Sequence, residues 1–196
     1  PMIFSSAYKR FSMGGLFGII STGECNEDLF YGTDYQSHMG VSRGGLVTVM
    51  SDGLFRGSIH DISKGPFKSR FYKDYLEMHG NMGIGAISAT TPQPLTIQTT
   101  FLSGKETFAI ACVGKMMNLG ALAEQLYSQK HCLSNVRDDA TPNIAEVAGS
   151  LISQCDTIPK GIQYLQESIE GSCSLLILTK GGIYAARDKY GRTSLT

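Results

Sequence analysis

Hydrophobic residues in the first half of the chain recur at spacings that predict strands, helices and one tight turn. Asn26 is the predicted N-terminal cap of the first helix, and Gly40 ends that helix. The pair Asp52-Gly53 predicts a hairpin turn, because it tolerates the positive φ angles that such a turn needs. Gly80 closes the second helix. In chain order, the predicted elements are a strand at 16–20, a helix at 26–40, a hairpin with strands at 45–51 and 54–56, and a helix at 66–78.

The second half continues with strands, then three adjacent helices, then a closing hairpin. Leucine or isoleucine recurs at helical spacing in each helix, and Thr141 before Pro142 is the predicted cap and first-turn proline of the middle one. The predicted elements are strands at 82–89, 95–100 and 108–113, helices around 119–126, 144–152 and 159–169, and strands at 173–179 and 183–187. Two groups of strands that flank adjacent helices predict an α+β fold rather than a parallel βαβ repeat.

The composition is that of an ordinary globular protein with one domain. Of the 196 residues, 42% are hydrophobic and 17% are charged, and 17 Lys and Arg balance 17 Asp and Glu. A net charge of zero gives no reason to expect nucleic acid or an anionic membrane as a partner. The apolar residues 13–20 are interrupted by three glycines and are too short to span a bilayer. With no signal peptide indicated, we expect a cytoplasmic protein.

The residues that most often carry chemistry indicate neither a metal nor a cofactor. The five cysteines are odd in number and form no C-x-x-C pair, so we expect reduced thiols instead of a zinc or redox site. The four histidines lack metal-ligand spacing. Gly80, Gly83 and Gly85 are a weak candidate for a phosphate loop, because they lie between a predicted helix and a strand, whereas such loops connect a strand to a helix.

Four segments follow one another in an order and spacing typical of a known family. They read G-L-F-G-I-I at 15–20, S-H-M-G-V-S-R-G-G-L at 37–46, G-N-M-G-I-G at 80–85 and R-D-K-Y-G-R-T-S-L at 187–195. In turn, they resemble the strand after the family's N-terminal cysteine, its Q-H-R-G-Q-D-S-A-G-I segment, its identical G-N-M-G-I-G segment and its closing R-D-x-x-G-x-R-P-L hairpin. The family is that of the class II glutamine amidotransferases, which are N-terminal-nucleophile hydrolases, and the resemblance is greatest to the glutaminase domain of amidophosphoribosyltransferase.

This resemblance implies a four-layer αββα sandwich in which two antiparallel sheets lie between helical layers. It agrees with the α+β grouping of the predicted elements. The resemblance covers residues 14–196 and leaves residues 1–13 as an N-terminal extension. Because the family continues beyond the position of Thr196, we expect either that the sequence is truncated or that another copy or a partner covers the sheet edge, since an uncovered edge strand favours association.

The resemblance also implies that the nucleophile of the family is missing. The family attacks glutamine with an N-terminal thiol that is activated by the α-amine of the same residue. Gly14 stands at that position, Ser12 is two residues too early, and Cys25 lies beyond the strand. We therefore expect no catalytic residue, with Gly14 as a degenerate nucleophile position.

Three further losses are implied in the substrate pocket. Ser88 replaces the arginine that grips the α-carboxylate of glutamine. Val113 replaces the asparagine of the pair that stabilises the oxyanion, so that only the amide of Gly114 remains. Ile144, or Asn143 if the register slips by one residue, replaces the acidic residue that binds the substrate ammonium group.

Two functions are compatible with these residues. The first is a domain with a degenerate active site, acting as a non-catalytic binding or regulatory subunit whose less charged pocket suits a partner protein or a neutral small-molecule ligand. The second is an active glutaminase subunit that delivers ammonia to a separate synthase of the glutamate synthase-like or amidophosphoribosyltransferase-like kind, with a nucleophile that this alignment misplaces. We expect a homo-oligomer or a complex with a partner synthase subunit, with no cofactor or metal and no binding to nucleic acid or membrane.

Overall fold

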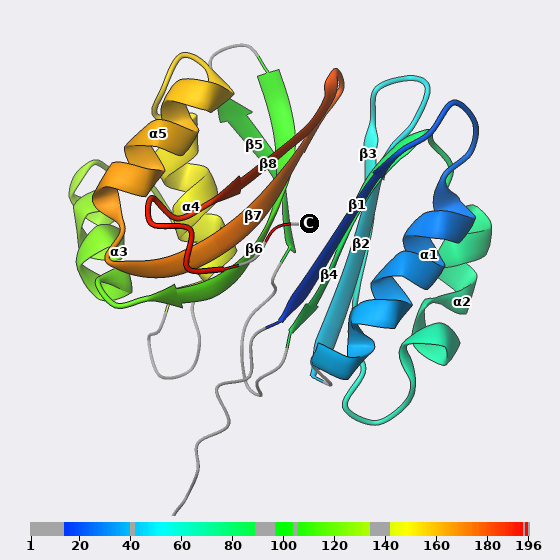
Figure 1. The fold of residues 1–196 in the computed structure, drawn as a ribbon. Helices are drawn as coiled ribbons and strands as arrows, with labels where there is room; N and C mark the ends of the chain where they lie inside the picture. Colours follow the sequence, from blue (N-terminus) through cyan, green and yellow to red (C-terminus); the bar gives the residue numbers. More distant parts are fainter. Residues whose placement is uncertain are drawn as a thin grey trace, which may run out of the picture.

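The chain folds as two antiparallel sheets packed face to face, each covered on its outer side by helices (Figure 1). The computed structural model describes residues 14–39, 42–88, 97–103, 106–133, 142–193 and 195, with only the backbone for residues 97–103. Helices, sheet, sheet and helices form four layers. This arrangement confirms the αββα sandwich predicted from the sequence.

The elements follow the predicted order, and several strands are longer than predicted. The first seven are β1 (Gly15–Ile20), α1 (Asn26–Tyr35), the 3-10 helix η1 (Gln36–Met39), β2 (Arg43–Val49), β3 (Phe55–Asp61), α2 (Phe67–Glu77) and β4 (Met82–Ser88). The next seven are β5 (Ile97–Ser103), β6 (Glu106–Met116), α3 (Leu119–Ser128), α4 (Ile144–Ser153), α5 (Ile158–Ser168), β7 (Gly171–Thr179) and β8 (Gly182–Arg187).

The first sheet has the strand order β1-β4-β2-β3, and α1 and α2 cover its outer face (Figure 1). Leu29 and Phe30 of α1 and Phe67 and Phe71 of α2 pack with Leu46 of β2 in one buried cluster. Each such side chain stabilises the fold by about 1.5–3 kcal/mol when it is fully buried. This cluster fixes the two helices on the sheet and thereby holds η1, which continues α1, beside the start of β1.

The second sheet has the order β5-β6-β7-β8, and its strand β6 contributes to two cores. Phe108, Ile110 and Cys112 lie in the core beneath α3, α4 and α5, whereas Ala109 and Ala111 lie in the core between the two sheets. Successive side chains of a strand point to opposite faces. A strand that is buried on both faces reads as a continuous apolar run, which explains why its sequence lacks polar alternation.

Two helix starts differ from the prediction. The first helix is capped at Cys25 instead of Asn26, whose side-chain Nδ2 donates to the carbonyl oxygen of Tyr75 at 3.2 Å. The middle helix of the second half is capped by Asn143, so Pro142 precedes the helix and is not in its first turn. The predicted cap Thr141 and the predicted helix end Gly40 lie outside the described residues.

The predicted hairpin turn at Asp52-Gly53 is confirmed. Gly53 has a φ of 78°, and its amide donates to the carbonyl oxygen of Met50 at 2.8 Å. A carboxylate oxygen of Asp52 accepts from the amide of Leu54 at 2.8 Å. The positive φ angle and the carboxylate that accepts a backbone hydrogen bond are the two features for which Asp-Gly pairs are favoured in turns.

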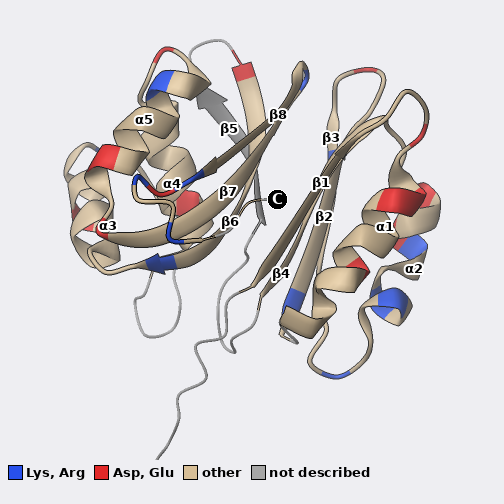
Figure 2. Cartoon of the chain, in the orientation of Figure 1, with Lys and Arg blue, Asp and Glu red and all other residues tan. Residues whose placement is uncertain are grey.

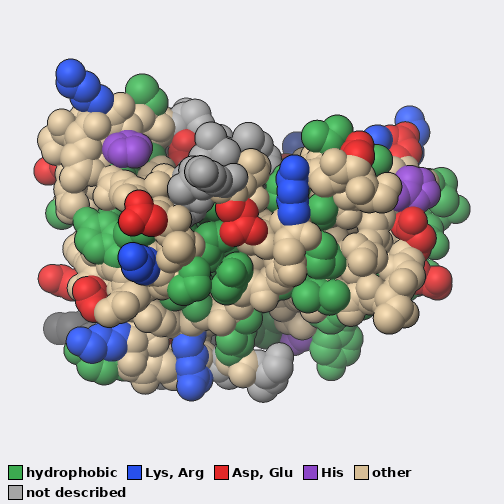
Figure 3. Space-filling view, turned by 90° about the horizontal axis from the view of Figure 1, so that it is seen from above, with side chains coloured by type: hydrophobic (Ala, Val, Ile, Leu, Met, Phe, Trp, Pro, Cys, Tyr) green, Lys and Arg blue, Asp and Glu red, His purple; other side chains and the backbone are tan. Residues whose placement is uncertain are grey.

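Charged side chains lie mainly on the helices and turns, and the strands that face each other carry few of them (Figure 2). Viewed from above in Figure 3, both signs are scattered over the surface, and no large patch of one sign forms on this face. Among the described residues, none of the helices combines the length and the apolar character needed to cross a membrane.

A glycine sets how closely α1 approaches the first sheet. A Cβ atom at Gly85 of β4 would overlap Oγ1 of Thr33, so we predict that Gly85→Ala lowers the free energy of unfolding by about 1–3 kcal/mol, because the helix must move outward. Gly120→Ala in α3 is the matched control, since nothing lies within 4 Å of a Cβ atom there, and it should raise stability by about 0.5 kcal/mol. Urea denaturation measures both variants, and equal stabilities would contradict the close packing.

Candidate functional site

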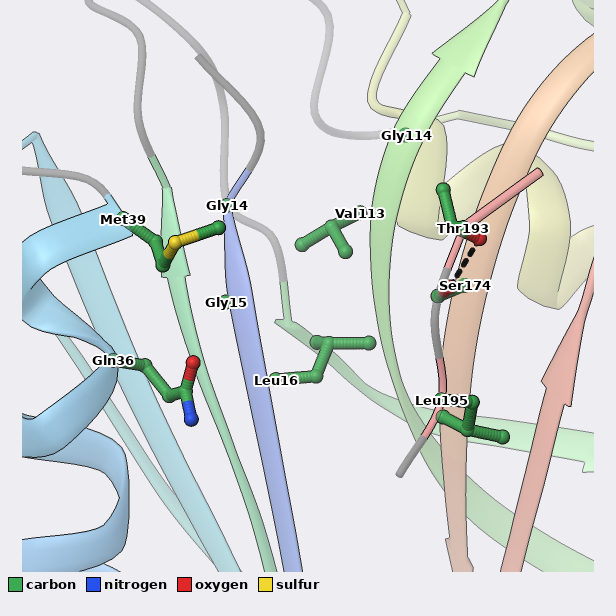
Figure 4. Close-up of a pocket in the computed structure, with 10 residues that line it drawn as sticks. All are labelled: Gly14, Gly15, Leu16, Gln36, Met39, Val113, Gly114, Ser174, Thr193 and Leu195. Atoms are coloured by element: carbon green, nitrogen blue, oxygen red, sulfur yellow. Dashed lines mark hydrogen bonds between the residues drawn. The ribbon is translucent and has the colours of Figure 1, made fainter.

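A cavity of about 190 Å³ opens between the two sheets where β1 begins (Figure 4). One wall comes from β1 and η1, and the other comes from β6, β7 and the C-terminal residues. The described residues that line it are Gly14, Gly15, Leu16, Gln36, Met39, Val113, Gly114, Ser174, Thr193 and Leu195. The cavity therefore lies where the resemblance puts an active site.

Three of the predicted site positions meet at this cavity. A Cβ atom at Gly14 would overlap the carbonyl oxygen of Ile87 and would lie 3.0 Å from Cγ1 of Val113. Gly114 has a φ of 147°, and a Cβ atom there would overlap the carbonyl oxygen of Ser172. The backbone at both glycines thus leaves no room for a side chain, at Gly14 because of close approach and at Gly114 also because of its φ angle.

Ser88 lies near these residues without lining the cavity. It is the last residue of β4 and is buried, and its carbonyl oxygen accepts a hydrogen bond from the amide of Ser42 at 3.1 Å. The antiparallel register pairs Gly15 with Ile87, so Ser88 follows directly at the level of Gly14. A short hydroxyl at this place supplies no positive charge for a carboxylate.

Asn143 and Ile144 are not brought to the cavity. The side-chain oxygen of Asn143 accepts from the amide of Ala145 at 2.8 Å and caps α4, which packs on the helix-covered face of the second sheet (Figure 1). Ile144 packs against the core beneath the helices. The Nδ2 atom of Asn143 is buried and has no hydrogen-bond partner among the described residues. In this structure both positions serve the helix and its core.

The buried cysteines do not supply a nucleophile to the cavity. Burial, together with the neighbouring carboxylate of Glu24, raises the pKa of the Cys25 thiol to about 11. The hydrogen bond to Cys173 and burial hold the pKa of Cys112 well above its ordinary value. Cys112 and Cys173 also belong to the core beneath the helices, on the other face of the second sheet from the cavity. A thiol is nucleophilic only as thiolate, so Cys25 and Cys112 are unreactive at neutral pH.

The cavity contains a pair of hydroxyl groups that the sequence did not single out. Ser174 Oγ lies 2.5 Å from Thr193 Oγ1, and Thr193 Oγ1 donates to the carbonyl oxygen of Cys173 at 3.2 Å. Both residues are buried. No ionisable side chain is among the described residues that line the cavity, so neither hydroxyl meets a base there that could activate it for attack.

The sequence did not identify the remaining lining residues, although they lie beside or inside the recognisable segments. Gln36 directly precedes the segment 37–46. Thr193 and Leu195 lie inside the closing segment, whose pattern indicates a hairpin of the fold and no role at a site. Their position beside or inside these segments is the one feature of the sequence that could have indicated their place at the cavity. Within the part of the chain that the structure describes, no three His, Cys, Asp or Glu side chains gather as metal ligands.

Comparison with known proteins identifies relatives of the whole described fold. No protein-family model matches the chain. The chain is homologous to an amidophosphoribosyltransferase from Haemophilus influenzae, with 24% identity in an alignment of 195 positions, gaps included; the match covers 91% of the chain and 37% of the relative. The chain thus spans little more than a third of the length of this relative.

Two solved structures show the same fold. A glutamine phosphoribosylpyrophosphate amidotransferase from B. subtilis, complexed with ADP and GMP, has a TM-score of 0.72 and 22% identity, and the match covers 89% of the chain and 37% of that protein. A second structure, described as the allosteric regulatory enzyme of purine biosynthesis, has a TM-score of 0.74 and 22% identity, and the match covers 91% of the chain and 38% of that protein. These two likenesses show that the chain shares the fold of the matched parts of those proteins.

The capping role of Asn143 gives a testable consequence. We predict that Asn143→Ala lowers the free energy of unfolding by about 1 kcal/mol, because the amide of Ala145 loses its partner. Asn143→Ser is the control, since serine keeps a capping oxygen and removes the unpaired amide nitrogen, and it should retain most of the stability. Thermal and urea unfolding measure both variants. A loss of equal size in both would show that the cap does not act through its oxygen.

Proposed function

We propose that this glutamine amidotransferase-like domain, which is related to amidophosphoribosyltransferase, does not hydrolyse glutamine and acts as a non-catalytic binding or regulatory subunit. The proposal rests on the protein atoms that surround Gly14. The nucleophile position holds no side chain, and the carbonyl oxygen of Ile87 and the side chain of Val113 occupy the space that one would need. Among the described residues at the head of β1, none therefore supplies an attacking group.

The walls of the cavity support the same proposal. Glutamine carries an α-carboxylate and an α-ammonium group, and each must be paired when it leaves water, because an unpaired buried ion costs several kcal/mol. The described lining residues offer neither a cation nor an anion. Stabilisation of a tetrahedral oxyanion would rest on backbone amides such as that of Gly114, without the asparagine side chain that Val113 replaces.

The competing function is an active glutaminase subunit that supplies ammonia to a separate synthase. Its support is the name and the homology of the relative, an amidophosphoribosyltransferase. Such activity requires a nucleophile and a base in contact with each other. Among the residues that line the cavity and are described, only the hydroxyls of Ser174 and Thr193 resemble a nucleophile, and they bond to each other and to the backbone.

Association with another chain is part of the proposal, as a homo-oligomer or with a partner subunit. The edge strands are β1 and β3 in the first sheet and β5 and β8 in the second. An edge strand presents unpaired backbone N–H and C=O groups, which favour pairing with another strand. The sequence of β8 contains no proline, and Ala185 and Tyr184 in it are exposed.

The protein should release no ammonia from glutamine above the uncatalysed background. We predict that Gly14→Cys does not create activity, because its Cβ atom overlaps the Ile87 carbonyl oxygen, and that this variant loses about 1–3 kcal/mol of stability. Gly23→Cys, where nothing lies within 4 Å of the Cβ atom, is the control for adding a thiol. A coupled ammonia assay measures all three proteins. Ammonia release by the unmodified protein that a thiol-directed glutamine analogue blocks would refute the proposal.

Light scattering at micromolar concentration should give a mass that is a multiple of 21.2 kDa if the partner is a second copy. We predict that Ala185→Lys lowers this mass toward that of the monomer, because a lysine on an exposed edge strand opposes edge-to-edge pairing. Gln163→Lys adds the same charge on the exposed side of α5 and should leave the mass unchanged. A monomeric unmodified protein would contradict the homo-oligomer and leave the partner subunit as the form of association to seek.

A further inference from the structure

The outer surface of α1 and α2 carries four large apolar side chains that are exposed to solvent. The two helices lie side by side on the first sheet (Figure 1). The exposed fractions are 51% for Tyr31 and 74% for Tyr35 on α1, and 58% for Tyr72 and 56% for Leu76 on α2. Tyrosine offers a large contact area at a low cost in conformational entropy and is enriched in protein–protein interfaces. The two helices therefore present a surface suited to another protein chain.

Contacts near both ends of α1 show that the two helices run antiparallel. Near the start of α1, Asn26 Nδ2 donates to the carbonyl oxygen of Tyr75, which lies near the end of α2. Near the end of α1, Asp34 Oδ2 lies 3.3 Å from Nζ of Lys68, which lies near the start of α2. The same Nζ lies 5.2 Å from the centroid of the Tyr31 ring. The side chains of the two helices thus form one continuous surface.

Asp28 of α1 and Lys73 of α2 lie at the same level of the two helices. Asp28 follows Asn26 by two residues, and Lys73 precedes Tyr75 by two residues. Each residue advances a helix by about 1.5 Å, so equal steps from the contact between Asn26 and Tyr75 keep the two charged residues level. Both residues are exposed. A carboxylate and an ammonium group thus reach solvent at one level of the helical layer.

Ion pairs within the chain leave α1 acidic and α2 basic on this surface. The carboxylate of Glu77 in α2 contacts the guanidinium of Arg56 in β3. The carboxylate of Asp74, also in α2, contacts the ring of His60 in β3. Figure 2 shows acidic side chains on α1 and basic ones on α2. The exposed charged residues of the two helices without an ion-pair partner in the described part of the chain are Glu27 and Asp28 on α1 and Arg70 and Lys73 on α2.

This surface is complementary in charge to a second copy of itself in one symmetric arrangement. In a two-fold dimer both copies contribute the same surface. An axis that runs across the helices places α1 on α1 and α2 on α2, so charges of like sign meet. An axis that runs along the helices, between them, places α1 of each copy on α2 of the other and leaves every residue at its level. Asp28 then meets Lys73 of the partner subunit, and the same contact forms twice.

We propose that a second copy of this chain binds to the outer face of α1 and α2 about a two-fold axis parallel to the helices. The exposed tyrosines and Leu76 fill the centre of the contact, and the two pairs of Asp28 with Lys73 of the partner subunit fix its direction. Exposed ion pairs contribute little each, so the dimer is weak and forms above micromolar concentration. The contact lies on the helix-covered face of the first sheet, away from the cavity and from β8, so it does not depend on the loss of glutamine hydrolysis.

The test is sedimentation equilibrium of the full chain from micromolar to millimolar concentration. Every protein carries Ala185→Lys, so that pairing through β8 does not contribute. We expect a monomer that becomes a dimer within this range, and a dimer that weakens several-fold when the salt concentration rises from about 0.1 M to about 1 M, because salt screens exposed ion pairs. Tyr72→Ser removes apolar contact area and should weaken the dimer about tenfold.

Exchanging the two charges tests the arrangement directly. Asp28→Lys and Lys73→Glu each turn two attractive contacts into two repulsive ones, so each variant alone should dimerise at least about tenfold more weakly. An equimolar mixture of the two variants restores both attractive contacts and should form a heterodimer about as tightly as the parent protein. Glu124→Lys on α3 and Lys160→Glu on α5 make the same charge changes at exposed positions of the other helical layer and should leave dimerisation unchanged.

The mixture also distinguishes a lost contact from a lost fold, because a misfolded variant could not recover in it. A parent protein that stays monomeric at millimolar concentration would overturn the inference and leave this surface to a chain of another sequence. A mixture that dimerises no better than its components, or a dimer that both single variants retain, would overturn it as well. None of these results changes the expected absence of ammonia release, which is measured separately.

Discussion

The face-to-face packing of the two sheets is the constraint on which the site depends. Ala86 of β4 and Ala109 and Ala111 of β6 are fully buried where the sheets meet, and larger apolar residues fill the space around them. Small side chains opposite larger ones let the two layers interdigitate at the density of protein interiors. The start of β1 is thereby held against β6, and protein atoms around Gly14, including the side chain of Val113, take the space that a side chain there would need.

The described lining of the cavity carries no charged side chain, which affects its stability. Buried charges that no ligand neutralised would carry a desolvation penalty, so an uncharged lining is the more stable one in the absence of a ligand. Val113 and Leu16 contribute apolar surface at the mouth between the sheets. The hydroxyls of Ser174 and Thr193 satisfy each other and the backbone, which leaves the pair stable without a ligand.

The order of the strands and helices could be predicted because the central strands are buried on both faces and read as apolar runs. The helix ends could not be fixed to the residue. Asn26 and Thr141 both have capping side chains, yet the helices begin after Cys25 and Asn143. Polar residues near a helix end compete for the free backbone amides, and tertiary contacts decide among them, as the bond from Asn26 to Tyr75 illustrates.

The candidate site could be predicted only at positions that the family resemblance aligns with catalytic or substrate-binding residues, as it does for Gly14, Val113 and Gly114. Thr193 reaches the cavity because the chain folds back after β8 and brings it to Ser174 of β7, and no local pattern reports this return. Their hydrogen bonds depend on the carbonyl oxygen of Cys173, and Cys173 is paired with Gly114 by the register of β6 and β7. One strand register therefore places the amide of Gly114 beside the carbonyl oxygen that holds the hydroxyl of Thr193. A fold held by three cores can exchange the side chains at such positions while the layers that hold them stay as they are.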